Sequence, residues 1–262
     1  MSEENLPSAR LQDLTDRVVI VTGSGQGIGR HYAKGLASAG AIPVIADLDE
    51  AKAQSVADEV SALGIDGLAV RSDVSEPASV EALVAAVIEK YGRVDALVNN
   101  AAIFSTLKMR PFEEIPIDEW NRVMSVNITG QMLCAKAVLP HMKKAGWGRI
   151  VHISSAAVKM GRPNYLHYTT SKAAVIGMTR SMAREVGPFG ITVNAILPGA
   201  TFTEVPRETV SPQQKDSIIA MQCIKRSQEP NDLLGTVLFL VSEGAGFLTG
   251  QSITVDGGAT HN

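Results

Sequence analysis

Seven short apolar runs, separated by longer segments with helical spacing of apolar residues, constrain the fold of this 262-residue chain more than any other feature. Each run is rich in β-branched residues and nearly continuous in apolar character, which is typical of strands buried on both faces. The runs are residues 17–23, 41–47, 67–73, 94–100, 148–154, 191–197 and 251–257. The helical segments between them are residues 28–39, 50–63, 75–92, 118–145 and 168–186. This alternation predicts an α/β fold with a doubly wound, seven-stranded parallel sheet and helices on both faces.

No repeat, low-complexity tract or linker divides the chain, so we expect residues 1–262 to form a single domain. One long segment, at about residues 201–228, lacks a clear strand or helix pattern and mixes apolar with charged residues. A segment of this length is rarely an idle loop. We therefore expect it to act as a lid over the substrate.

Charge and composition exclude several classes of partner. The net charge is −3 and the pI is about 6.0, so no basic field is available to bind nucleic acid or an anionic membrane. The first 16 residues lack the apolar core of a signal peptide, and no apolar run approaches the length of a membrane span. Cys134 and Cys223 lie far apart without further ligands, so we expect no metal site and a reducing compartment. The simplest prediction is a cytoplasmic protein.

A glycine-rich turn, T-G-S-G-Q-G-I-G at residues 22–29, follows the first apolar run and opens the first helical segment. Glycines at such a junction let backbone N–H groups approach a phosphate, with the positive end of the helix behind them. A plain tight turn is the alternative, but four glycines within residues 23–29 argue against it. We predict dinucleotide contacts at Gly23, Gln26, Gly27, Ile28 and Gly29.

A carboxylate at the end of the second run indicates which dinucleotide is bound. Asp47 lies 18 residues past Gly29, where it can accept hydrogen bonds from the adenosine ribose and would repel a 2′-phosphate. Its neighbour Leu48 and the turn residue Gln26 offer such a phosphate no cation. A cap or turn role for Asp47 is the alternative. We therefore expect NAD as the cofactor.

Two further strand ends are candidate cofactor contacts. Asp73 can bond an adenine amino group while Val74 flanks the ring, although helix capping explains Asp73 equally well. Asn100 and Ala101 follow the fourth run, where small residues let the backbone approach a cofactor or simply pack the strand end.

The stretch N-Y-L-H-Y-T-T-S-K at residues 164–172 holds two tyrosines and a lysine. Tyr168 and Lys172 are four residues apart, so on a helix they share a face, and Tyr165 would share it too. A phenol with a pKa near 10 is a poor base at neutral pH, but a nearby positive charge favours the phenolate. The pair alone is also common on solvated helix faces, and it does not decide between the two tyrosines.

In context, the chain resembles the short-chain dehydrogenase/reductase family, with a Rossmann-type fold. The matching motifs occur in order along nearly the whole chain: T-G-x-x-x-G-x-G at 22–29, Asp73, N-N-A at 99–101, Asn127, Ser155, Y-x-x-x-K at 168–172 and P-G-x-x-x-T at 198–203. One departure is Ala102, where the family usually has glycine.

The resemblance implies a catalytic set of Asn127, Ser155, Tyr168 and Lys172. It selects Tyr168 over Tyr165, because the family's serine precedes its tyrosine by about a dozen residues. Ser155 would bond the substrate oxygen; Ser154 points to the opposite side of an extended strand. Asn127 would hold a water linking Lys172 to solvent. The resemblance also adds cofactor contacts at Tyr168, Lys172, Pro198, Gly199 and Thr203, and we expect Tyr165 and Phe202 to contact the substrate.

The resulting prediction is an NAD-dependent oxidoreductase that transfers a hydride between the nicotinamide and a secondary alcohol or ketone, with Tyr168 as acid and base. One alternative is a 3-oxoacyl-thioester (acyl carrier protein) reductase of the same family, normally dependent on NADPH. An alternative of another class is a non-catalytic dinucleotide-binding sensor, which should have lost part of the catalytic set.

We also expect a homotetramer. The resemblance implies this assembly, and the helix after Tyr168 is too apolar for one sheet to cover. The residues concerned are Ala173, Ala174, Val175, Ile176, Met178 and Met182.

Overall fold

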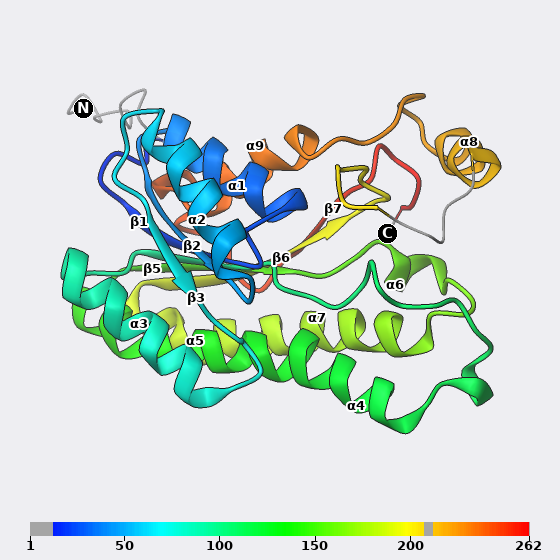
Figure 1. Cartoon of the computed structure of the whole chain (residues 1–262), viewed down its shortest axis with the longest axis horizontal. Coiled ribbons are helices and arrows are strands. Elements are labelled where there is room, and N and C mark those ends of the chain that lie inside the picture. The colour runs from blue at the N-terminus through cyan, green and yellow to red at the C-terminus, as the bar shows by residue number, and fades with distance from the viewer. Residues whose placement is uncertain (1–12, 207–211, 262) are drawn as a thin grey trace, which may run out of the picture.

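The computed structural model describes residues 13–206 and 212–261 and has a seven-stranded parallel sheet at its centre (Figure 1). The strand order is β3-β2-β1-β4-β5-β6-β7, and every pair is parallel. All seven predicted strands are confirmed. They are β1 (Val18–Thr22), β2 (Ile42–Asp47), β3 (Leu68–Arg71), β4 (Ala96–Asn99), β5 (Gly148–Ile153), β6 (Ile191–Pro198) and β7 (Ser252–Val255).

Helices cover both faces of the sheet, as expected for a doubly wound fold (Figure 1). One layer holds α1 (Gly27–Ser38), α2 (Glu50–Ser61) and α9 (Asn231–Leu240). The other holds α3 (Pro77–Tyr91), α5 (Gly130–Ala145) and α7 (Leu166–Val186). Three further helices lie toward the carboxyl ends of the strands: α4 (Ile117–Met124), α6 (Ala157–Met160) and α8 (Pro212–Met221).

The alternation of side chains along β1 divides the core in two. Val18 and Ile20 pack in the cluster formed with α3, α5 and α7, whereas Val19 and Val21 pack in the cluster formed with α1 and α9. All four side chains are buried. Because the side chains on both faces of this strand are apolar, helices must cover both faces. This explains the unbroken apolar run in the sequence.

The segment predicted as one helix over residues 118–145 is interrupted. A π-helical turn, η2 (Ser125–Thr129), separates α4 from α5 and contains Asn127, which is fully buried. Such turns are rare and occur frequently at functional sites. Periodicity alone could not place this turn, because apolar residues keep helical spacing on both sides of it.

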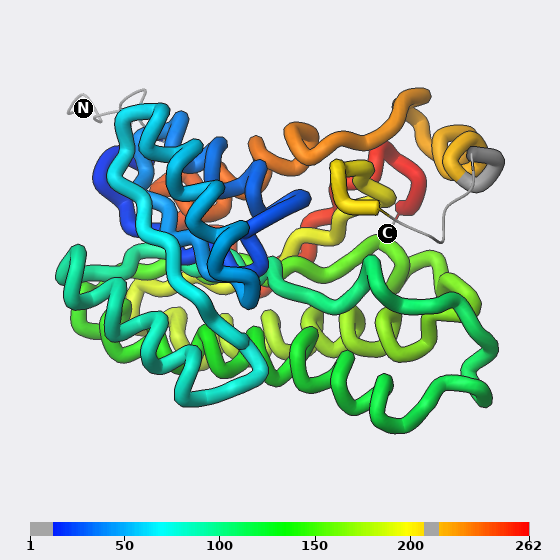
Figure 2. Tube along the Cα trace, viewed as in Figure 1, coloured from blue at the N-terminus to red at the C-terminus, as the bar shows by residue number. Residues whose placement is uncertain are grey.

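The two ends of the expected lid segment lie side by side. A bridge joins Thr201 to Gln228, and the N–H of Phe202 donates to the carbonyl of Gln228 at 3.0 Å. Between these ends lies α8, and residues 207–211 of the segment lie outside the described residues. The C-terminal residues after β7 lie beside this segment (Figure 2), with the N–H of Cys223 donating to the carbonyl of Gly257.

Candidate active site

The carboxyl ends of the central strands line a cavity of about 1300 Å³. This volume exceeds the range of about 300–1,000 Å³ that is usual for one small ligand, so it has room for two ligands side by side. All of the predicted cofactor contacts line the cavity, and Ser155 does too. The cavity lies where the order of the sheet reverses between β1 and β4, the usual ligand position in folds of this type.

The glycine turn between β1 and α1 packs too closely for larger residues. Gly23 has a positive φ of +62°, and a Cβ there would lie 2.8 Å from the Cα of Ala101. A Cβ on Gly29 would lie 2.3 Å from the carbonyl oxygen of Gly23. The Asn100 side chain donates to the carbonyls of Thr22 and Gly23, which ties the end of β4 to this turn. The turn therefore presents bare backbone to the cavity at the N-terminus of α1.

A carboxylate that the sequence did not single out lies at this N-terminus. The N–H of Gly27 donates to Oε1 of Glu204 at 3.0 Å, and Arg30 lies 3.6 Å from the same oxygen. Partial burial opposes ionisation of Glu204, but the N–H of Gly27 and the charge of Arg30 outweigh it, so the pKa is lowered. The chain thus places its own anion where a dinucleotide phosphate is expected.

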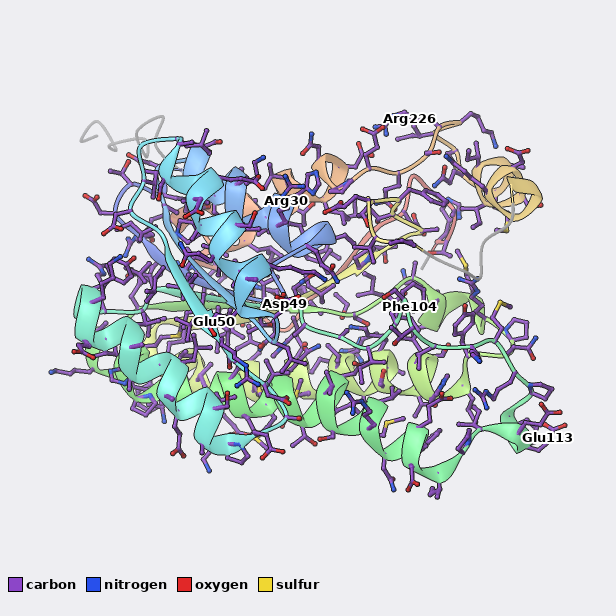
Figure 3. The ribbon with its side chains drawn as sticks, viewed as in Figure 1. Arg30, Asp49, Glu50, Phe104, Glu113 and Arg226 are labelled. Carbon is purple, nitrogen blue, oxygen red and sulfur yellow. The ribbon has the colours of Figure 1, made fainter. Side chains whose placement is uncertain are left out.

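Asp47 lies at the end of β2 and is held from two sides. Its Oδ2 accepts from the N–H of Gly25 at 2.8 Å, and its Oδ1 accepts from the N–H of Asp49 at 3.1 Å. Figure 3 shows Asp49 at the beginning of α2, beside this edge of the sheet. The carboxylate lines the cavity, so the predicted ribose contact and the alternative turn role are compatible.

The expectation that no cation lies near Asp47 is wrong. Lys52 on α2 donates from Nζ to Oε1 of Gln26 at 2.9 Å and lies 3.6 Å from Asp49. A Cβ on Gly25 would lie 2.8 Å from the Cβ of Lys52. The sequence neighbours of Asp47 did not reveal Lys52, because the first turn of α2 brings it back toward the glycine turn.

Asp73 and Val74 also line the cavity. The N–H and hydroxyl of Ser75 both donate to Oδ1 of Asp73, so Asp73 closes a turn. It does not cap the following helix, because the N-cap residue of α3 is Glu76. Val74 is buried against α5, because a Cβ on Gly130 would lie 2.8 Å from its Cγ2.

Tyr168 and Lys172 lie one turn apart on α7, as their spacing predicts. The Nζ of Lys172 is 5.7 Å from the centroid of the Tyr168 ring and donates to the carbonyl of Ile153 at 2.8 Å. Lys172 is only 2% exposed, and burial lowers its pKa to about 7. His152, fully buried on β5, has its pKa lowered to about 3 by burial and by the charge of Lys172. Lys172 is therefore the cation that titrates near neutral pH beside this phenol.

The two serines after β5 are used differently. The Ser154 hydroxyl is buried and donates to the carbonyl of Lys172 at 2.7 Å, which fixes α7 against the strand. The Ser155 Oγ accepts from the N–H of Ala157 at 3.2 Å and keeps its own proton to donate. This difference favours Ser155 over Ser154 as the group that faces a ligand.

The Asn127 side chain does not line the cavity. Its Oδ1 accepts from the N–H of Ile103, and its Nδ2 donates to the carbonyl of Ile103 and to the hydroxyl of Ser171. That hydroxyl donates in turn to the carbonyl of Tyr168. Because the side chain is occupied on both ends, any relay through Asn127 would have to use its backbone carbonyl.

The two predicted substrate contacts, Tyr165 and Phe202, do not line the cavity. Tyr165 precedes α7, with φ −134° and ψ 35°, so it does not share the helical face of Tyr168. Its ring is 1% exposed and packs behind Phe104, with 5.9 Å between centroids. Phe202 packs against Lys215, whose Nζ is 4.7 Å from the ring centroid, and its backbone joins Gln228.

Apart from Ile218 and Met221, which belong to the expected lid segment, the wall beyond Tyr168 comes from residues that the sequence did not indicate. Phe104, on the loop after β4, has its ring centroid 4.5 Å from that of Tyr168, and Figure 3 shows it near α6. Other side chains on this wall come from α6, α8 and the loops beside them: Met109, Met160, Arg162, Ile218 and Met221. No local motif marks such residues, because they meet only through the tertiary fold.

No helix within the described ranges is long and apolar enough to cross a membrane. Among the same residues, no group of three or more His, Cys, Asp or Glu side chains is arranged to hold a metal ion.

Comparison with known proteins extends over almost the whole chain. A family model described as enoyl-(acyl carrier protein) reductase matches residues 23–260. The chain is 38% identical to a (2S)-((R)-hydroxy(phenyl)methyl)succinyl-CoA dehydrogenase subunit of Thauera aromatica, covering 94% of this chain and 97% of that protein. It is 36% identical to a 3-oxoacyl-(acyl-carrier-protein) reductase of Synechocystis, covering 94% and 97%.

Among solved structures, a 7α-hydroxysteroid dehydrogenase complexed with NADH and 7-oxo glycochenodeoxycholic acid is similar, with a TM-score of 0.92 and 33% identity. The match covers 98% of this chain and 99% of that one. The similarity therefore extends over nearly the whole of both chains.

Proposed function

Because the chain belongs to the short-chain dehydrogenase/reductase family of oxidoreductases, we propose that it interconverts a secondary alcohol and a ketone with NAD, using Tyr168 as acid and base. The observation that carries this proposal is the Tyr168–Lys172 pair. Lys172 is buried 5.7 Å from the Tyr168 ring, and both side chains line the cavity with Ser155.

The cavity residues fit a nicotinamide dinucleotide. The glycine turn at the N-terminus of α1 suits the diphosphate, and Asp47 suits the adenosine ribose. Lys172 would bond the other ribose, and Pro198, Gly199 and Thr203, which also line the cavity, would border the nicotinamide. When bound, the nicotinamide accepts or supplies the hydride.

The remaining chemistry is proton transfer by this chain. In oxidation, Tyr168 removes the hydroxyl proton of the alcohol, and in reduction it returns a proton to the carbonyl oxygen. Ser155 donates a hydrogen bond to that oxygen and holds it in place. The Lys172 ammonium stabilises the phenolate, and a phenolate one turn away in turn offsets the cost of burying the ammonium.

NAD rather than NADP is the proposed cofactor, on the strength of Asp47. The kcat/KM values for NADH and NADPH test this with Asp47→Asn, alone and combined with Lys52→Gln. We expect the wild type to favour NADH strongly and Asp47→Asn to gain activity with NADPH. The double variant should lose much of that gain, because Lys52 is a cation beside Gln26 of the glycine turn. Equal kcat/KM values in the wild type would refute the role of Asp47.

A 3-oxoacyl-thioester reductase is the second candidate. Lys52 favours it to a degree, because a lysine beside the glycine turn could assist NADPH, and the Synechocystis relative carries that activity in its name. A panel of simple ketones and 3-oxoacyl thioesters, each with NADH and NADPH, distinguishes the two. Turnover of no carbonyl compound would favour a non-catalytic dinucleotide sensor.

The same proposal includes the organisation of the chain and its setting. The chain is one catalytic and cofactor-binding domain, and segment 201–228 covers the substrate. The protein works in the cytoplasm as a homotetramer, and its substrate is a small-molecule alcohol or carbonyl compound.

A further inference from the structure

We propose that Arg162 binds an anionic group of the substrate, so that the substrate is an alcohol or ketone with an apolar body and a carboxylate or phosphate terminus. This inference rests on the proposed function, because it assigns the substrate to the part of the cavity beyond Tyr168.

The walls of this part are mainly apolar. Phe104 contacts the Tyr168 ring, Met160 ends α6, and Ile218 and Met221 lie on α8. Figure 1 shows α6 and α8 at the same end of the molecule, beyond the carboxyl ends of β5 and β6. A largely apolar wall with few polar groups is typical of a pocket for an apolar ligand that is oriented by those groups.

Of the described side chains on this wall, Arg162 is the cation, and Arg122 on α4 also lines the cavity. It lies on the loop between α6 and α7, is half-buried and lines the cavity. Its guanidinium carbon is 4.7 Å from the centroid of the Tyr165 ring, and that ring makes a T-shaped contact with Tyr168 with 6.5 Å between centroids. Because Tyr165 is almost completely buried, the guanidinium rests on a fixed aromatic surface close to the proposed reaction centre.

Arg162 has no carboxylate partner among the side chains that the structure describes. Within residues 13–206 and 212–261, four acidic residues line the cavity. Asp47, Asp73 and Glu76 lie at the ends of β2 and β3, the proposed adenosine end. The carboxylate of the fourth, Asp256, accepts hydrogen bonds from the N–H groups of Gly258, Ala259 and Thr260 and from the Thr260 hydroxyl.

Among the residues that the structure describes, this end of the cavity therefore lacks an anion. A stacked guanidinium holds its donors in a fixed plane, which suits two parallel hydrogen bonds to a carboxylate or a phosphate. A neutral ligand would leave that charge half-desolvated and unpaired. An anion with an apolar body would pack against the apolar side chains of the wall and pair with the Arg162 guanidinium.

The test is calorimetric binding of unreactive probes to the NADH-loaded enzyme. The probes are the ω-phenylalkanoates from phenylacetate to 6-phenylhexanoate, the matching neutral amides, and 3-phenylpropyl phosphate. We expect the wild type to bind at least one acid or the phosphate more tightly than the amide of equal length. Preference between the carboxylate and the phosphate distinguishes the two kinds of anion.

Arg162→Gln should weaken the binding affinity for the preferred anion about 10- to 100-fold, and it should change the affinity for the amide about twofold or less. Arg162→Lys should be intermediate, because a lysine supplies the charge without the planar pair of donors. Lys108→Gln is the matched control, since Lys108 is exposed on the loop beside Met109 and does not line the cavity. It should leave both affinities unchanged.

Three results would overturn the assignment: no anion binds the wild type, Arg162→Gln weakens acid and amide equally, or Arg122→Gln on α4 abolishes the preference instead. Reduction of the neutral ketone 4-phenyl-2-butanone is measured in parallel. If the wild type reduces it but shows no preference for anions, only the role of Arg162 fails. If no ketone is reduced, the proposed function fails, and the binding results still decide whether Arg162 holds an anion.

Discussion

At the scale of single residues, Tyr168 is the group on which the proposed reaction depends. Tyr168→Phe keeps the ring and removes only the ionisable oxygen, so we expect kcat to fall about 100-fold or more while NADH binding is retained. Tyr165→Phe is the matched control. Because Tyr165 lies behind Phe104 and not on the cavity wall, both kcat and KM should stay within a few-fold of the wild type.

Steady-state kinetics of these two variants side by side check the assignment. An inactive Tyr165→Phe with an active Tyr168→Phe would show that the motif is misaligned, and the proposed role of Ser155 would then fail as well.

Lys172 should make the stability of the cofactor-free protein depend on pH. Burial lowers its pKa from an ordinary value of 10.5 to about 7, so between these values the unfolded chain binds the extra proton. Stability should therefore rise with pH in this window, as the folded lysine becomes neutral. Relative to Lys172→Met, the wild type should gain about 2 to 3 kcal/mol in the free energy of unfolding between pH 6.5 and pH 9.

Urea unfolding of both proteins at the two pH values measures this gain. Parallel stability curves for the wild type and Lys172→Met would mean that the lysine keeps an ordinary pKa in the folded protein.

At the scale of elements, the N-terminus of α1 already holds an anion. Glu204 accepts the N–H of Gly27 where a diphosphate is expected to bind, so cofactor and carboxylate compete for one positive helix end. Glu204→Gln keeps an acceptor oxygen and removes the charge. We expect it to tighten NADH binding about 3- to 10-fold at low salt, with a smaller effect at high salt.

Fluorescence titration with NADH tests this expectation, and Glu113→Gln, an exposed acid on η1 (Phe112–Glu114), controls for net charge. Weaker binding by Glu204→Gln would mean that the carboxylate assists the cofactor instead of competing with it.

At the scale of the whole molecule, the proposed assembly depends on α7. The structure corrects part of the reasoning, because Val175 is fully buried in the chain's own core, while Ala173 and Gly177 are exposed. A Cβ on Gly177 would meet nothing within 4 Å, so a larger residue there leaves the subunit intact. We expect light scattering of the wild type to give four times the chain mass of 27.8 kDa.

Gly177→Glu should dissociate this assembly without unfolding the subunit, since a charge would be buried between copies. A monomeric wild type at micromolar concentration would refute the tetramer, and a tetrameric Gly177→Glu would exclude this face of α7 from the interface.

The sequence by itself determined the features that depend on local periodicity. Continuous apolar runs can be satisfied only by strands covered on both faces, so all seven strands and the two helical layers followed from them. The glycine turn and the Tyr168–Lys172 pair were equally predictable. In each case the constraint lies between residues a few positions apart, in the steric limits of glycine or the pitch of a helix.

Only the tertiary structure decided which side chains meet away from regular elements. Tyr165 has the spacing of a shared helical face, but it precedes the helix and points elsewhere. Arg162 reaches the cavity, and Lys52 and Glu204 reach the glycine turn, through chain reversals that bring distant segments together. Their positions depend on how loops pack against the completed sheet, and no short-range pattern in the sequence predicts that packing.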